Sequence, residues 1–121
     1  MASLNMIGPF ELTTEKVNEV VKETKPGNYG LGFQDEKDWK FGVQLIGRAD
    51  ADLKAELLTQ VGKAQYSRFM YSYADTAKTA FEKECWNYHN FGGKKYLANQ
   101  SHPQKPAGAA DCKCPVPGCK E

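Results

Sequence analysis

Two stretches of alternating apolar and polar residues, separated by a short polar link, constrain the fold of this chain more than any other feature. Apolar side chains occupy every second position of both stretches: Tyr29, Leu31 and Phe33, then Trp39, Phe41, Val43 and Leu45. This period is typical of β-strands with one buried face. Residues 34–38 between them are polar and few enough to form a hairpin loop. We therefore expect an antiparallel strand pair, with Gly30 and Gly32 indicating close packing or a bulge on its other face.

Three helices and a third strand are expected around this hairpin. Apolar residues at helical spacing predict helices over residues 14–25, 51–62 and 76–89. Their expected N-cap residues are Thr13 or Thr14, Asp50 and Asp75. Residues 66–73 predict a strand, one face of which carries Phe69, Tyr71 and Tyr73. Residues 1–12 carry no clear pattern.

These elements predict an α+β fold in which helices flank a small, three-stranded, mostly antiparallel sheet. The expected organisation is an N-terminal helical extension over residues 1–24, a folded domain over residues 25–100, and a C-terminal tail over residues 101–121 that is rich in proline and cysteine. A chain of 121 residues is long enough for one domain with its own core.

The charge of the chain is nearly balanced, which excludes a strongly basic nucleic-acid binder. Sixteen basic and fifteen acidic side chains give a net charge of +1. Residues 1–60 hold seven basic and ten acidic side chains, and residues 61–121 hold nine and five, so a polyanion would prefer the second half. No apolar run approaches the roughly 20 residues that span a bilayer. With no secretory signal pattern in residues 1–10, we expect a cytoplasmic monomer or weak oligomer without a membrane partner.

Glu84 is the residue whose position is hardest to explain by packing alone. It lies on the apolar face of the predicted helix over residues 76–89, together with Ala77, Ala80, Phe81 and Tyr88. A buried carboxylate needs a partner, and a divalent cation such as Mg²⁺ is one that carboxylate oxygens bind readily. The alternatives are a glutamate at the edge of the helix, or one that is bonded to a tyrosine hydroxyl or to Arg48.

The hairpin also carries a resemblance to a known family. Gly27-Asn28-Tyr29 and Leu45-Ile46-Gly47 resemble the two paired strand motifs of the GIY-YIG nuclease superfamily. In that family a helix follows the second motif, then a third strand, and then a helix with a metal-binding glutamate, which corresponds to Glu84. A late asparagine corresponds to Asn99. The resemblance covers about residues 27–99 and implies the family's fold and phosphodiester hydrolysis.

The resemblance implies roles for four residues in the cleavage of nucleic acid, DNA in the first place. Glu84 would hold one Mg²⁺ or Mn²⁺ ion, Tyr29 would help to activate the attacking water, and Asn99 matches the late asparagine. Arg48 would supply the guanidinium that stabilises charge on the phosphate, with Arg68 as the other candidate. If it is active, the domain is then a divalent-metal-dependent endonuclease.

Departures from the family pattern support a second hypothesis. The family's second tyrosine falls on Leu45, its helix arginine falls on Glu56 (or on Ala55 if the register shifts by one), and the polar residue one turn later is Gln60. Without that arginine the domain would be catalytically degenerate, or it would serve as a non-enzymatic protein-interaction or regulatory module. A nuclease needs the four site residues in one cleft, whereas an interaction module needs Glu84 to be neutralised within the protein.

The tail contains a cluster of metal-binding residue types. Cys112, Cys114 and Cys119 lie within eight residues of each other. Structural zinc prefers four Cys or His ligands in a tetrahedron. The nearest candidate for a fourth ligand is His102, and the others lie on the predicted helix, namely Cys85 and His89. A ligand from the helix would fix the tail to the domain. The alternatives are a tail with unligated thiols and a disulfide within the tail.

Overall fold

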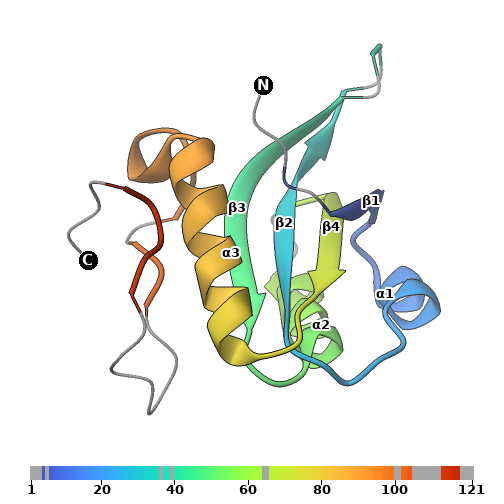
Figure 1. Cartoon of the computed structure of the whole chain (residues 1–121). Coiled ribbons are helices and arrows are strands. Elements are labelled where there is room, and N and C mark those ends of the chain that lie inside the picture. The colour runs from blue at the N-terminus through green and yellow to red at the C-terminus, as the bar shows by residue number, and fades with distance from the viewer. Residues whose placement is uncertain are drawn as a thin grey trace.

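The computed structural model describes residues 4, 6–35, 37–38, 40–63, 66–99, 102–104 and 113–117. The elements within these residues follow in the order β1 (Ile7–Glu11), α1 (Thr14–Val20), β2 (Gly27–Gln34), β3 (Phe41–Ala49), α2 (Leu53–Lys63), β4 (Arg68–Tyr73), α3 (Ala77–Asn90) and the 3-10 helix η1 (Gly93–Lys95). This is an α+β fold, and the expected hairpin is confirmed as β2 and β3 (Figure 1). Trp39 lies outside the described residues.

The sheet has four strands in the order β1-β4-β2-β3, and every neighbouring pair is antiparallel. The expectation of three strands was therefore wrong, because β1 pairs with β4 and adds an edge strand. The register between these two strands shifts between the pairs Ile7↔Tyr71 and Phe10↔Phe69. Such an irregularity interrupts the alternation of side chains, which explains why residues 7–11 carry no strand pattern.

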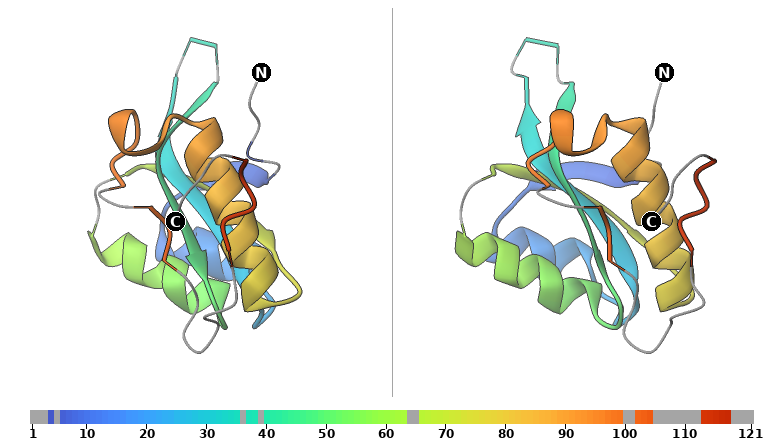
Figure 2. Two further views of the ribbon diagram at one scale, coloured as in Figure 1. Left: turned by 60° about the vertical axis from the view of Figure 1, so that its left-hand side comes forward. Right: turned by 90° about the vertical axis from the view of Figure 1, so that its left-hand side faces the viewer.

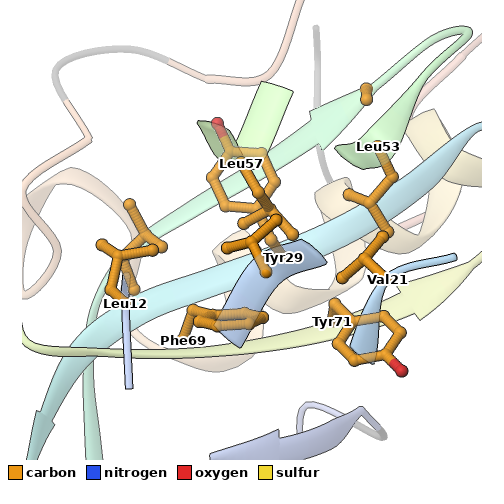
Figure 3. Packing of buried hydrophobic residues seen from close by; sticks show 10 residues of the cluster. Leu12, Val21, Tyr29, Leu53, Leu57, Phe69 and Tyr71 are labelled. Atoms are coloured by element: carbon orange, nitrogen blue, oxygen red, sulfur yellow. The ribbon is translucent and has the colours of Figure 1, made fainter. Parts of the chain in front are cut away.

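The helices cover both faces of the sheet. α1 and α2 lie side by side on one face and α3 lies on the other, as Figure 2 shows. The larger core cluster fills the space between the sheet and the first two helices (Figure 3) and consists of Leu12, Val17, Val21, Tyr29, Leu31, Ala49, Leu53, Leu57, Phe69 and Tyr71. The first 21 residues thus contribute three side chains to the main core.

A smaller cluster lies on the α3 face of the sheet. Its buried members are Leu4, Ile46, Tyr88 and Leu97. Polar groups share this interface, since the buried amide of Asn28 donates to the carbonyl oxygen of Ala80 at 2.8 Å. The two faces of the sheet therefore differ in character, and the polar face is the one that faces α3.

A β-bulge in the hairpin separates residues that were expected on one face. The register of β2 and β3 shifts between Leu31 and Gly32, so the side chains of Val43 and Leu45 pack into different clusters. The expected bulge is confirmed, while the expected common face of the second stretch was wrong. One extra residue reverses the alternation of a strand, and no local pattern marks the position where this happens.

The N-caps of the helices agree only in part with expectation. Thr13 caps α1 by accepting from the backbone N–H of Lys16 at 3.1 Å, as predicted. α3 is capped by Thr76 and not by Asp75, because Thr76 and Thr79 form a reciprocal capping box. Asp50 does not cap α2. Its carboxylate binds Arg48, and Asp52 accepts from the first turn of α2 in its place.

No helix in the part of the chain that the structure describes is long and apolar enough to cross a membrane.

Candidate functional site

Tyr29 lies on the face of the sheet that α1 and α2 cover, and its hydroxyl contacts two polar side chains of α2. It is directly opposite Gly47 across the β2–β3 pair, and a Cβ atom at Gly47 would lie 2.3 Å from the tyrosine ring. Only glycine leaves room for the ring there. The Tyr29 hydroxyl donates to Glu56 at 3.2 Å and accepts from Gln60 at 3.3 Å. The helix position that contacts the tyrosine is therefore Glu56, and Ala55 is exposed.

The environment of Tyr29 holds its hydroxyl in the neutral form. Burial is the largest cause that raises the pKa of Tyr29, and the charge of the neighbouring Glu56 carboxylate raises it further. A tyrosine that helps to remove a proton from water needs the opposite shift. The hydroxyl is suited to donating a hydrogen bond to Glu56.

Arg48 and Glu84 meet on the opposite face of the sheet. Arg48 projects from β3 toward α3, and its Nη1 lies 2.5 Å from Oε1 of Glu84. Both side chains are about one tenth exposed, at 11% and 10%. The guanidinium also donates from Nε to Asp50 at 2.7 Å and lies 5.2 Å from the centre of the Phe81 ring. The buried carboxylate predicted on this helix is thus compensated by an arginine.

The charges in this cluster depend on each other. Burial raises the pKa of the Glu84 carboxyl, while the hydrogen bond and positive charge of Arg48 act in the opposite direction. Burial also disfavours the charged form of Arg48, but its hydrogen bonds to Asp50 and Glu84 outweigh that effect and raise the pKa of the guanidinium. The result is a buried ion pair in which each partner favours the charged form of the other, although burial outweighs the effect of Arg48 and leaves the pKa of the Glu84 carboxyl raised.

Asn99 binds the edge of the sheet. Its Oδ1 accepts from the backbone N–H of Ile46 at 2.9 Å, and its Nδ2 donates to the carbonyl oxygen of Ile46 at 2.7 Å. The neighbouring Ala98 N–H donates to the carbonyl oxygen of Gln44 at 2.5 Å. β3 is an edge strand, so these bonds occupy backbone groups that would otherwise be open to another strand.

The four predicted site residues therefore lie in three places. Arg48 and Glu84 are brought together on the α3 face, Tyr29 is bonded to α2 on the other face, and Asn99 is bonded to the β3 backbone. The alternative guanidinium, Arg68, is 3.5 Å from the carboxylate of Glu11.

A second cluster lies on the outer side of α3, where the tail passes the helix (Figure 1). Cys85, His102 and Cys114 each place one possible metal-ligand atom within 4.8 Å of the others. Cys114 and Val116 pack against Phe81 and the buried Cys85. The tail residues His102 and Cys114 were predicted as ligands, and Cys85 was one of the candidates for a ligand from the helix. Cys112 and Cys119 lie outside the described residues.

Two features of these sites were missed by the sequence prediction. The strand pattern predicts that Asn28 lies on the face opposite Tyr29, but it does not predict that this polar side chain is buried. The pairing of Asp50 with Arg48 was also missed, and the only signal was that the two oppositely charged residues are two positions apart.

No protein-family model, curated protein or solved structure matches this chain.

Proposed function

We propose that this chain is a non-enzymatic protein-interaction domain that uses a GIY-YIG-like arrangement of strands and helices as a scaffold. The observation that carries the proposal is the ion pair between Arg48 and Glu84. In a nuclease of this family, the carboxylate would hold a metal ion and the guanidinium would bind a phosphate. Here the two groups bind each other instead.

The other contacts support the same conclusion. The sequence contains two arginines, Arg48 and Arg68, and both are ion-paired with carboxylates. The helix position that faces Tyr29 carries Glu56, whose negative charge would repel a phosphate. A domain that cleaves phosphodiesters needs cationic groups directed at the substrate, since electrostatic stabilisation is the largest part of such catalysis.

A resident Mg²⁺ or Mn²⁺ ion does not fit the surroundings of Glu84. A hard divalent cation takes several oxygen ligands. Here the guanidinium binds one oxygen of Glu84, and the amide of Asn99 is bound to the backbone of Ile46. The cytoplasmic location of the protein stays a prediction from its sequence.

The proposal is tested by incubating the full chain with supercoiled plasmid and with branched DNA in the presence of Mg²⁺ or Mn²⁺. The expected result is no cleavage by the wild type above the background of buffer alone. Glu84→Gln keeps a hydrogen-bond acceptor for Arg48, and Glu82→Gln on the same helix is the matched control. Cleavage that persists in Glu82→Gln and disappears in Glu84→Gln would overturn the proposal and establish a nuclease.

A metal-binding measurement on the same protein separates the two hypotheses further. Mn²⁺ broadens the amide signals of nearby residues in nuclear magnetic resonance spectra. We expect that Mn²⁺ affects the signals of residues 82–86 equally in the wild type and in Glu84→Gln. Selective broadening of these signals that is lost in Glu84→Gln would show a metal at the carboxylate despite its arginine partner.

A further inference from the structure

We propose that Cys85, His102 and Cys114 bind a structural Zn²⁺ ion that fixes the C-terminal tail to the outer side of α3. This inference does not depend on whether the domain cuts nucleic acid, because the three proposed ligands and the Arg48–Glu84 pair are different side chains. One ligand comes from the middle of a helix and two come from tail segments that are far from it in sequence.

The donor set and its spacing suit zinc. Thiolate sulfur and imidazole nitrogen are the ligands that structural zinc sites use. Around a tetrahedral ion with Zn–S distances of about 2.3 Å, neighbouring ligand atoms stand about 3.8 Å apart. The three ligand atoms here lie within 4.8 Å of one another, so a small contraction brings them to that separation.

A backbone contact of His102 indicates which of its ring nitrogens could bind a metal. Its Nδ1 lies 2.8 Å from the carbonyl oxygen of Pro103. A carbonyl oxygen can only accept, so Nδ1 carries the proton and Nε2 carries the lone pair that binds a metal. A histidine ligand commonly donates its other N–H to a backbone carbonyl, which fixes the tautomer and the ring. The rings of Tyr88 and His89 pack against His102 with centroid distances of 5.5 Å and 5.2 Å.

The surroundings of Cys85 explain why a metal would add stability here. Cys85 is fully buried and Cys114 is partly buried, and within the described residues the apolar cluster that joins helix and tail has two further members, Phe81 and Val116. Such a small cluster buries little apolar surface to offset the entropy of ordering a tail. Zinc replaces the two thiol protons, which pass to solvent, and its binding energy then stabilises the ordered tail.

A tetrahedral site needs a fourth ligand, and the sequence contains three candidates for it. Cys112 and Cys119 supply thiols from the tail, and His89 follows Cys85 by one helical turn and therefore lies on the same side of α3. Single variants of these residues identify the ligand, because loss of the fourth donor weakens binding while loss of either of the others does not.

The test measures metal bound to the full chain after purification under reducing conditions. We expect one zinc per chain and, after exchange with Co²⁺, the visible absorption of tetrahedral cobalt together with a thiolate-to-cobalt charge-transfer band. Cys114→Ser and His102→Ala should each weaken Co²⁺ binding at least about 100-fold. Lys113→Ala, an exposed neighbour of Cys114, is the matched control and should bind as the wild type does.

The role of Cys85 distinguishes a metal that links the tail to α3 from a metal that is bound by the tail alone. Cys85→Ser should also lose the metal, and circular dichroism should show that its helices are retained. Addition of a chelator to the wild type should expose residues 102–104 and 113–117 to proteases, and the same exposure should occur in Cys114→Ser without a chelator. Because Cys114 lies outside the main core, this variant remains informative if Cys85→Ser does not fold.

Three results would overturn the proposal. The first is a folded and fully reduced wild type that binds neither Zn²⁺ nor Co²⁺. The second is full zinc content in a folded Cys85→Ser variant, because the metal would then be bound by the tail alone. The third is a disulfide that involves Cys85 or Cys114 in the purified protein, found by mass spectrometry of peptides, with no metal binding after its reduction.

Discussion

The two faces of the sheet are built on different principles, although the same strands form both. The face that is covered by α1 and α2 is closed by a large apolar cluster, and the hydroxyl of Tyr29 is one of its few polar groups. The face that is covered by α3 contains a buried amide, an ion pair and, on the outer side of the helix, a cysteine and histidine cluster. The first face therefore derives its stability mainly from burial of apolar area, whereas the second combines a smaller apolar cluster with the pairing of specific polar groups.

This difference predicts how each face responds to mutation. An apolar cluster loses stability in proportion to the volume removed, because the remaining side chains relax only partly around a cavity. A buried polar pair loses most when a single partner is removed, because the other is then left charged in an apolar environment. Removal of both partners together costs less.

The largest effect is expected on the apolar face, from Leu57→Ala. Leu57 is fully buried between α2 and the sheet. Its truncation should lower the free energy of unfolding by about 4 kcal/mol, measured by urea denaturation. Thr59→Ala on the exposed side of the same helix is the control and should change stability by no more than about 0.5 kcal/mol. Equal effects of the two variants would show that α2 does not close the core.

The next effect is expected on the polar face, from Arg48→Met. The substitution leaves the Glu84 carboxylate buried without its partner and should cost about 3 kcal/mol at neutral pH. The double variant Arg48→Met/Glu84→Met should recover a large part of that loss, because it replaces the pair with apolar side chains. Urea denaturation of the single and double variants measures the coupling. If the two substitutions were simply additive, the polar face would not depend on pairing.

Asn99→Ala tests how firmly the chain after η1 covers the edge of β3. It removes both hydrogen bonds to the backbone of Ile46 and should cost about 2 kcal/mol. Hydrogen exchange of the Ile46 amide should become faster than in the wild type. Asn99→Asp keeps the acceptor for this amide and loses the donor to the carbonyl oxygen, so slow exchange should be retained in part. Unchanged exchange in Asn99→Ala would mean that other contacts protect the edge.

The smallest effect is expected from Tyr29→Phe. It removes one hydroxyl from the apolar face and should cost about 1 kcal/mol at neutral pH. Because the pKa of Tyr29 is raised in the folded state, ionisation favours the unfolded chain once the pH exceeds about 10, the value of an unperturbed tyrosine. The wild type should therefore lose stability above that pH relative to Tyr29→Phe, in thermal unfolding measured from neutral to alkaline pH. A constant difference between the two proteins would contradict this.

Local patterns were sufficient to predict the hairpin, the three helices and β4. In these elements the apolar residues recur with periods of 2 or 3.6 residues. Such a period depends only on which side chains one face of the element must bury. The unusual position of Glu84 on an apolar face could be identified in the same way. So could the cluster of cysteines in the tail, since metal-binding residue types are visible in the composition of a short segment.

Tertiary structure alone decided the fourth strand, the position of the bulge and which of the candidate partners each polar group takes. β1 is defined by its pairing with β4, and the bulge between Leu31 and Gly32 determines that Val43 and Leu45 face opposite sides. Arg48 and Glu84 are 36 positions apart, and Cys85 meets Cys114 only because the tail returns to α3. A sequence determines which groups need a partner when they are buried, but the partner is determined by the path of the chain, because hydrogen bonds, ion pairs and metal ligation require atoms within a few ångströms of each other.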